Sequence, residues 1–166
     1  MTGTQKKNPL GPTGQAVADN VRRLRGDMQY VKLAARLAEL GRPIPTLGLR
    51  KIESYERRVD ADDLVALAAA LDVSPVTLLM PSGVAVDDLV SVADTEFKAG
   101  VLWEWLIAEW PFPHRSGLAE FFARALPPWK LAMVERRIAH RHGVETLQEL
   151  EKPITLRFGD ADDGES

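Results

Sequence analysis

The 166-residue sequence contains no cysteine, which excludes disulfide scaffolds, zinc sites built on thiolates and catalysis by a cysteine nucleophile. It also lacks any apolar run that approaches the roughly 20 residues that a membrane-spanning helix needs. The opening segment, MTGTQKKNPLGPTG, has no apolar core of the kind that marks a secretory signal peptide. We therefore expect a soluble, cytoplasmic protein that does not use a membrane as a partner.

Motifs of the common enzyme classes are missing as well. Neither GxxxxGK[ST] nor GxGxxG occurs, so the chain has no glycine-rich loop of the kind that holds nucleotide phosphates. No serine, histidine and aspartate fall into a nucleophile motif. His140 and His142 lie two residues apart on an expected helix and point in different directions, which disfavours a metal site. We expect a protein that is not an enzyme and that binds no cofactor or metal.

The composition is that of a folded protein with an uneven distribution of charge. The chain is 45% hydrophobic and 27% charged, and its length suits one ordinary domain or two small ones. Residues 1–59 carry 12 Lys/Arg and 5 Asp/Glu, whereas residues 60–113 carry 1 and 10. This asymmetry favours a polyanionic partner for the N-terminal part. A single domain with a dipolar charge distribution is the alternative.

Apolar residues recur at helical spacing through the first half of the chain. Three helices are expected to bury Val17, Val21 and Leu24; Leu33, Ala34 and Leu37; and Leu49 and Ile52. Gly41 should end the second helix in a left-handed conformation. The prolines of Arg42-Pro43-Ile44-Pro45 keep the next segment extended, and the third helix is predicted from about Thr46 to Tyr55.

Two further helices complete an expected all-α domain at 13–82. Asp60 is a predicted N-cap, and Asp62 and Asp63 fall in the first turn, where the helix dipole favours negative charge. The stripe that this helix buries is Leu64, Leu67, Ala68 and Leu71. Ser74-Pro75 then predicts a short fifth helix, because serine is a good cap and proline suits the first helical position.

Residues 83–152 are expected to form a small helical C-terminal domain. Its first helix is predicted to start at Asp94 and to include Phe97, and two others follow from about Leu118 and Pro128. The aromatic residues Trp103, Trp105 and Trp110 indicate a core or a subunit interface rather than a ligand pocket. Residues 1–12 are expected to be a disordered tail, and 153–166 a short strand or coil at 154–158 followed by an acidic tail.

Several motifs in 21–80 occur in an order known from one family. They are Leu24-Arg25, Leu33-Ala34, the run Leu49-Arg50-Lys51-Ile52-Glu53, and DADDLVALAAALDVSPVTLLM. Together they resemble the Cro and lambda-repressor type (XRE) helix-turn-helix regulators, in particular the actinobacterial members. The resemblance implies a five-helix domain that binds double-stranded DNA, with the third helix in the major groove. It implies a sequence-specific transcriptional regulator, such as a repressor. We expect a homodimer, because one short helix reads only a few base pairs and two monomers a helical turn apart double the contacts.

The resemblance also implies roles for seven residues. Thr46, Leu47 and Lys51 occupy base-contacting positions, and Arg50 lies beside them. Leu47 can contact a thymine methyl group, and an arginine or lysine can read guanine. The implied phosphate contacts come from Tyr30, Arg57 and Arg58. For Tyr30 the alternative is a tyrosine at the rim of the core, and for Arg57 and Arg58 it is simple solvated charge.

The segment departs from the family's pattern in the turn before the third helix, which is longer, and at Tyr55, where the family has glycine. A bulky residue is strained in the left-handed conformation that is expected there. The alternative function is a protein-binding module, an antitoxin or adaptor, that has kept the fold and lost DNA binding. Such a module would use the acidic stretch at 60–113. The aromatic residues of 97–122 are the candidate dimer interface, and the C-terminal domain is a candidate site for a protein partner.

Overall fold

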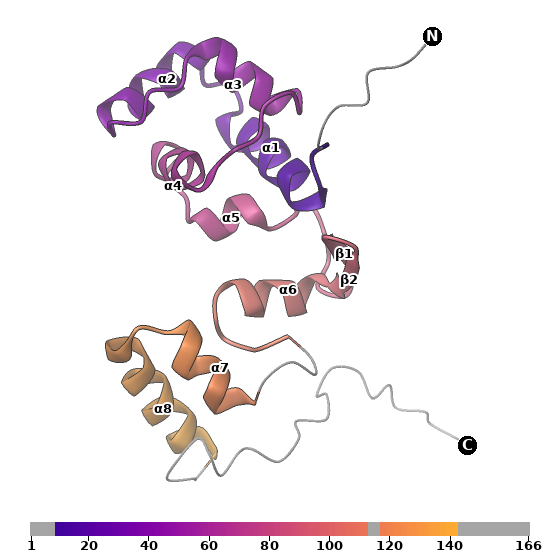
Figure 1. Cartoon of the computed structure of the whole chain (residues 1–166), viewed down its shortest axis with the longest axis vertical. Helices are drawn as coiled ribbons and strands as arrows, with labels where there is room; N and C mark the ends of the chain where they lie inside the picture. Colours follow the sequence, from indigo (N-terminus) through magenta and orange to yellow (C-terminus); the bar gives the residue numbers. More distant parts are fainter. Residues whose placement is uncertain (1–8, 113–116, 143–166) are drawn as a thin grey trace, which may run out of the picture. The chain divides into compact units, whose positions relative to one another are not determined.

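A computed structural model of the chain describes residues 9–112 and 117–142 (Figure 1). The chain divides into two compact units, Met1–Trp103 and Glu104–Ser166. The expected strand or coil at 154–158, the acidic tail and the first eight residues of the N-terminal tail lie outside the described residues. The predicted helical character is confirmed, because helices account for most of the described residues and the strands form only one small sheet.

The first unit begins with five helices in the part of the chain where helices were predicted. They are α1 (Pro12–Arg25), α2 (Tyr30–Glu39), α3 (Thr46–Glu53), α4 (Ala61–Ala70) and α5 (Pro75–Leu79). Both predicted caps are confirmed: the Asp60 carboxylate accepts a hydrogen bond from the Asp63 amide, and the Ser74 hydroxyl accepts one from the Val76 amide. These side chains satisfy amides that have no partner inside their own helix.

The ends of α2 and α3 share one backbone arrangement. At the end of α2, Gly41 has φ 76°, and the amides of Gly41 and Arg42 donate to the carbonyls of Ala38 and Leu37. At the end of α3, Tyr55 has φ 62° and Glu56 donates to the Lys51 carbonyl at 2.8 Å. Both ends are Schellman motifs. The left-handed conformation predicted for Gly41 and for Tyr55 is therefore present at both residues.

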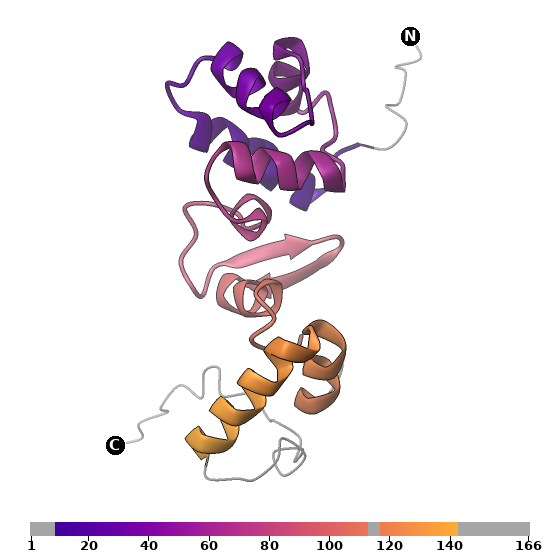
Figure 2. The same ribbon diagram turned by 90° about the vertical axis from the view of Figure 1, so that its left-hand side faces the viewer.

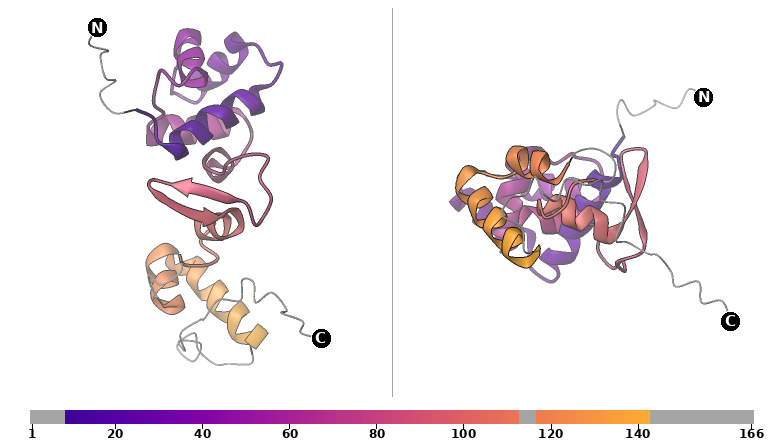
Figure 3. Two further views of the ribbon diagram at one scale, coloured as in Figure 1. Left: turned by 90° about the vertical axis from the view of Figure 1, so that its right-hand side faces the viewer. Right: turned by 90° about the horizontal axis from the view of Figure 1, so that it is seen from below.

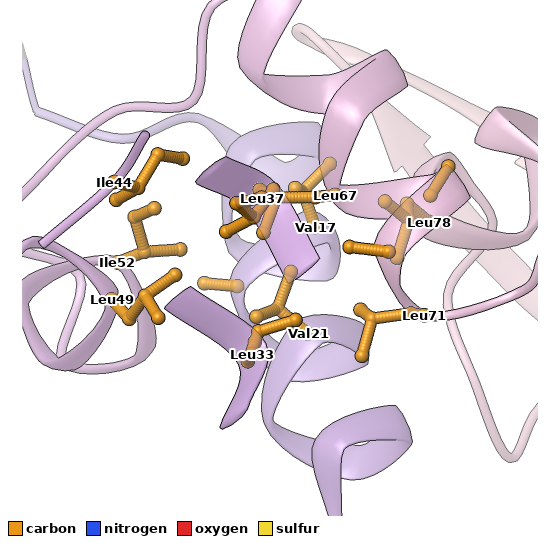
Figure 4. Packing of buried hydrophobic residues seen from close by; sticks show 13 residues of the cluster. Val17, Val21, Leu33, Leu37, Ile44, Leu49, Ile52, Leu67, Leu71 and Leu78 are labelled. Carbon is orange, nitrogen blue, oxygen red and sulfur yellow. The ribbon is translucent and has the colours of Figure 1, made fainter. Parts of the chain in front are cut away.

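The core of the first unit lies between the five helices (Figure 4). Its buried residues are Val17, Ala18, Val21, Leu33, Leu37, Ile44, Leu49, Ile52, Leu67, Ala68, Ala70, Leu71 and Leu78. Ile44 belongs to the extended segment between α2 and α3 and is 2% exposed. The long turn therefore contributes an apolar side chain to the core, which fixes the path by which the chain enters α3.

A β-hairpin follows the five helices. The prediction that a helix starts at Asp94 is therefore wrong about where that helix begins. Strands β1 (Leu89–Val92) and β2 (Thr95–Lys98) pair antiparallel, with Val92 opposite Thr95. The helix, α6 (Ala99–Leu106), starts only after the hairpin. Asp94 lies in the two-residue turn rather than at a helix cap.

The hairpin is joined closely to its neighbours within the first unit. The amides of Ala99 and Gly100 donate to the carbonyls of Asp88 and Val86, so the first turn of α6 lies against the hairpin (Figures 2 and 3). Val90 is buried, and β1 contacts α1. The hairpin therefore belongs to the first unit, whereas the domain boundary was predicted at 82–83, before it.

The second unit contains α7 (Leu118–Ala125) and α8 (Pro128–His142). Leu118, Phe122 and Val134 form its buried core, and Trp110 packs against them. The Trp105 ring stacks on Phe112, with 4.3 Å between the ring centroids. Trp110 and Phe122 thus pack within the second unit, although they belong to the aromatic residues of 97–122 that were predicted to form a dimer interface. None of the helices in the described residues is both long and apolar enough to cross a lipid bilayer.

Candidate nucleic-acid interface

Helices α2 and α3 lie together at the end of the first unit that is away from the hairpin (Figures 1 and 2). On α3, Leu49 and Ile52 are fully buried, whereas Leu47, Arg50 and Lys51 are exposed. Thr46, the first residue of α3, is half-buried. This division follows from the helical period, which places residues three and four apart on one face. One face of α3 is therefore fixed in the core, and the other presents a polar surface with one exposed leucine.

Glu53 anchors the inner face of α3 through its carboxylate. The Arg25 guanidinium, on α1, makes a bidentate ion pair with it, with Nε–Oε1 and Nη2–Oε2 distances of 2.7 and 2.9 Å. The Tyr30 hydroxyl, on α2, donates to the same carboxylate at 2.7 Å. The Glu53 side chain is 6% exposed. One carboxylate thus joins α1, α2 and α3, and we call Arg25, Tyr30 and Glu53 the Glu53 cluster.

The Glu53 cluster keeps its carboxylate ionised. Burial disfavours the charged form of Glu53, but the hydrogen bonds from Arg25 and Tyr30 outweigh it, and the pKa of Glu53 lies below its ordinary value. The hydrogen bond to Glu53 raises the pKa of the Tyr30 hydroxyl, with burial adding to the effect. The cluster therefore remains a salt bridge with a protonated tyrosine at neutral pH.

These contacts give Tyr30 a structural role beside the phosphate contact that the resemblance implies. Its hydroxyl proton is used by Glu53, and its ring packs at the edge of the core. This is the rim-of-core position that the sequence left open as the alternative. Arg25 likewise forms an ion pair with the Glu53 carboxylate, and Arg22 donates to the Glu53 backbone carbonyl. Neither of these α1 arginines is a simple surface cation.

Arg50 lies over the Tyr30 ring. Its guanidinium carbon is 5.2 Å from the ring centroid, within the range of a cation–π contact. Arg50 and Lys51 are both exposed, and neither forms an ion pair with any residue in the part of the chain that the structure describes. They are the two cations that α3 presents on its exposed face.

Arg57 has a structural contact that the sequence did not indicate. Its Nη2 donates to the Asp63 carboxylate at 2.7 Å, and the other oxygen of Asp63 accepts from Arg42 Nε at 2.8 Å. The Asp63 side chain is 2% exposed. A Cβ placed on Gly48 would lie 2.7 Å from Arg57 Nη1, so Arg57 crosses over α3 at its glycine. Arg57 is therefore neither a simple phosphate contact nor simple solvated charge.

Arg58 is exposed at the loop that follows α3, where it donates to the Pro9 carbonyl. The remaining predicted residues are those of α3, and the structure places Thr46, Leu47, Arg50 and Lys51 on a single short helix. Of the seven predicted site residues, Tyr30 and Arg57 are thus tied to buried carboxylates. The α3 residues and Arg58 extend to the surface.

Sequence reasoning missed the two buried carboxylates, Glu53 and Asp63. A signal for Glu53 was present, because it lies four residues after Leu49 and so shares the buried face of α3. A carboxylate at such a position needs a cation from another element. Asp63 was predicted only as a first-turn residue that suits the helix dipole. Nothing local in the sequence points to Arg42 and Arg57 as its partners.

The rest of the described residues holds no cluster of metal-ligating side chains. No three histidine, aspartate or glutamate side chains in residues 9–112 and 117–142 come together in a way that suits a metal ion. No buried side-chain polar atom in this part of the chain is left without a hydrogen-bond partner. No family model, curated protein or solved structure matches the chain.

Proposed function

We propose that this protein is a sequence-specific, double-stranded DNA-binding transcriptional regulator of the Cro and lambda-repressor helix-turn-helix kind. In this proposal α3 lies in the major groove. The observation that carries it is the two-sided character of α3: Leu49, Ile52 and Glu53 fix one face in the core, while Leu47, Arg50 and Lys51 are exposed on the other.

The geometry of B-DNA supports this use of α3. The major groove is about 12 Å wide and admits one α-helix, and each base pair presents there its own pattern of donors, acceptors and methyl groups. Arg50 and Lys51 supply donors for guanine, Thr46 supplies a hydroxyl, and Leu47 supplies an apolar surface for a thymine methyl group. The set covers the contact types that direct readout of bases requires.

The anchoring of α3 supports readout rather than mere attraction to charge. Discrimination between bases requires donors that keep their position relative to the duplex, because each misplaced donor leaves an unmade hydrogen bond. The Glu53 cluster fixes α3 to α1 and α2, and Ile44 fixes the segment that leads into it. In this proposal the contacts to the DNA backbone come from Arg58 and Arg57, and Tyr30 acts through its place in the Glu53 cluster.

We further propose that the regulator acts in the cytoplasm as a homodimer. One short helix reads only a few base pairs, whereas two monomers that are one helical turn of DNA apart double the contacts. The second unit is the proposed self-association or partner-binding part. Its exposed Trp129 and Met133, four residues apart on α8, replace the buried Phe122 as the apolar residues available for such a contact.

Selection from a pool of random duplexes tests the proposal. The full chain should enrich a defined sequence, and the Arg50→Ala, Lys51→Ala double variant should enrich none while it unfolds at an unchanged temperature. Arg124→Ala in α7, which also removes an exposed cation, is the matched control and should enrich the wild-type sequence. A protein-binding module would instead enrich no sequence with the wild-type chain, and the double variant would keep its protein partner.

A further inference from the structure

We infer that Tyr30 is a positioning residue for Arg50 and that the Arg50 guanidinium, held on the Tyr30 ring, reads a guanine in the target DNA. This inference rests on the proposed function, because it specifies which side chain of α3 supplies base discrimination and what holds that side chain in place. Three observations about Tyr30 and the arginines beside it lead to this inference.

The Tyr30 ring contacts two guanidinium groups. The guanidinium carbon of Arg25 is 4.1 Å from the ring centroid, and that of Arg50 is 5.2 Å from it. The π-face of a tyrosine attracts a cation electrostatically, and a planar guanidinium also stacks on it. A single aromatic side chain therefore links the buried ion pair beneath α3 to an exposed arginine on its surface.

The two arginines differ in what else they bind. Arg25 is neutralised by its bidentate ion pair with Glu53. Arg50 has no carboxylate partner among the residues that the structure describes. The positive charge and the hydrogen-bond donors of Arg50 are therefore available to a ligand, and the ligand that satisfies them is anionic or rich in acceptors.

Tyr30 is itself fixed in position. It is the first residue of α2, its ring packs against the core of the first unit, and its hydroxyl donates to Glu53 at 2.7 Å. An aromatic ring held by the core and by its hydroxyl restricts the arginine whose guanidinium lies over it. Arg50 thus loses part of its rotamer freedom before it meets DNA, which lowers the entropy that binding must remove.

A restricted guanidinium suits one base edge in the major groove. Guanine presents two acceptors there, O6 and N7, which match the paired N–H donors of arginine, and this is the commonest specific contact between proteins and DNA. Lys51, beside it, is a flexible point charge and discriminates less between acceptors. The base preference of the protein should therefore depend on Arg50 and on the ring that holds it.

The test uses the full chain and the duplex that it enriches from a random pool. Each guanine of that duplex is replaced in turn by 7-deazaguanine, which lacks the N7 acceptor. The wild-type chain should lose roughly fivefold or more in affinity at one guanine, because one of the two hydrogen bonds of a bidentate contact is removed, and less than the roughly 150-fold upper limit for the whole contact. Arg50→Ala should bind both duplexes equally, and Arg50→Lys should lose most of the difference. Arg124→Ala, in α7, should keep it.

Two variants of Tyr30 separate the ring from the hydroxyl. Both Tyr30→Phe and Tyr30→Leu remove the hydrogen bond to Glu53, but only Tyr30→Phe keeps a ring under Arg50. Tyr30→Phe should retain the 7-deazaguanine effect, and Tyr30→Leu should lose most of it. If Tyr30→Leu does not fold, Tyr30→Met takes its place, since methionine also removes the ring and keeps an apolar side chain of similar length.

The outcomes distinguish this inference from the proposed function. A wild-type chain that enriches no duplex overturns both. A wild-type chain that enriches a duplex, with Tyr30→Leu and Tyr30→Phe equally sensitive to 7-deazaguanine, overturns the positioning role of Tyr30 alone. A duplex in which no guanine responds to the replacement overturns the guanine contact and leaves DNA binding in place.

Discussion

Buried carboxylates account for several of the cations that make the first part of the sequence basic. Arg25 pairs with Glu53, and Arg42 and Arg57 pair with Asp63. A carboxylate that is removed from water needs such partners, because its desolvation is costly when it is left alone. Part of the basic character of residues 1–59 is therefore used in internal ion pairs, and the exposed cations of α3 are the part that the proposed DNA binding would use.

Replacement of Glu53 should weaken the fold, since it leaves Arg25 without its partner. We expect Glu53→Gln to lower the free energy of unfolding by about 2 kcal/mol or more at neutral pH, as for a broken pair with little solvent exposure. Urea denaturation followed by circular dichroism measures this. Glu56→Gln, in the exposed loop after α3, is the control and should change little; equal effects of the two variants would contradict the role of the Glu53 cluster.

The same pair predicts a dependence on pH. The folded-state pKa of Glu53 lies below its ordinary value of 4.5, so protonation favours the unfolded chain. The stability that ionised Glu53 contributes is complete above the ordinary pKa and is lost as the pH falls through the lower, folded-state pKa. The difference in unfolding free energy between wild type and Glu53→Gln should be constant from neutral pH to about 5 and should then shrink. A difference that grows on acidification would contradict this.

Asp63 offers a comparison between neighbouring residues on α4. Asp63→Asn leaves both Arg42 and Arg57 without their buried partner. The Asp62 side chain, by contrast, is 83% exposed, and its carboxylate lies 3.9 Å from the Arg42 guanidinium, a longer and weaker pair. We expect Asp63→Asn to lower the melting temperature by several degrees, about 4–8 °C per kcal/mol for a domain of this size. Asp62→Asn should leave the melting temperature nearly unchanged. Equal shifts would indicate that burial does not decide the strength of these pairs.

At the level of helices and strands, most elements of the first unit follow from local sequence signals. The N-caps Asp60 and Ser74 and the helix end at Gly41 were predictable because each depends on residues a few positions apart. The hairpin was missed because Asp94 suits a helix cap and a tight turn equally well. What decides between them is the pairing of Val90 with Phe97 across the turn and the contact of β1 with α1, neither of which is local.

The candidate site was predictable to the extent that it depends on helical spacing. The exposed positions Leu47, Arg50 and Lys51 follow from the buried positions Leu49 and Ile52 on the same helix. The contacts of Tyr30 and Arg57 were not predictable, because Glu53 is 23 residues from Tyr30, and the contact of Arg57 with Asp63 depends on how the loop after α3 folds back onto α4. Local pattern gives the face that a residue occupies, whereas tertiary packing decides whether its polar atoms are already used.

The turn of the hairpin gives a prediction for an element. Ala93 has φ 52°, a conformation that favours glycine, and the turn joins two strands in a tight connection. We expect Ala93→Gly to raise the free energy of unfolding by about 0.5–1 kcal/mol. Ala35→Gly, on the exposed side of α2, is the matched control and should lower it by a similar amount. Two changes of the same sign would contradict the assignment of this turn.

At the level of the whole molecule, the proposed division of labour places readout in the helices up to α5 and association in the second unit. Every buried residue of the main core lies between Val17 and Leu78, and the hairpin contacts α1, so a fragment that ends at Trp103 keeps the whole first unit. We expect this fragment to fold but to bind its target duplex at least roughly tenfold more weakly than the full chain, since it loses the second half-site contact. Sedimentation of both proteins measures their oligomeric state.

The truncation result can contradict the dimer without affecting readout. A fragment that binds as tightly as the full chain would show that the second unit does not contribute to DNA affinity. If the fragment and the full chain both sediment as monomers, the second unit does not mediate self-association. In either case the role proposed for α3 would stand on its own evidence.

The central claim is that the exposed face of α3 distinguishes base pairs. The most direct measurement is the ratio of the affinity for the selected duplex to that for a shuffled duplex of the same composition, by fluorescence anisotropy at one fixed salt concentration. For the wild-type chain this ratio should be about 10³ or more, and for the Arg50→Ala, Lys51→Ala variant it should approach one. A wild-type ratio near one would contradict the account.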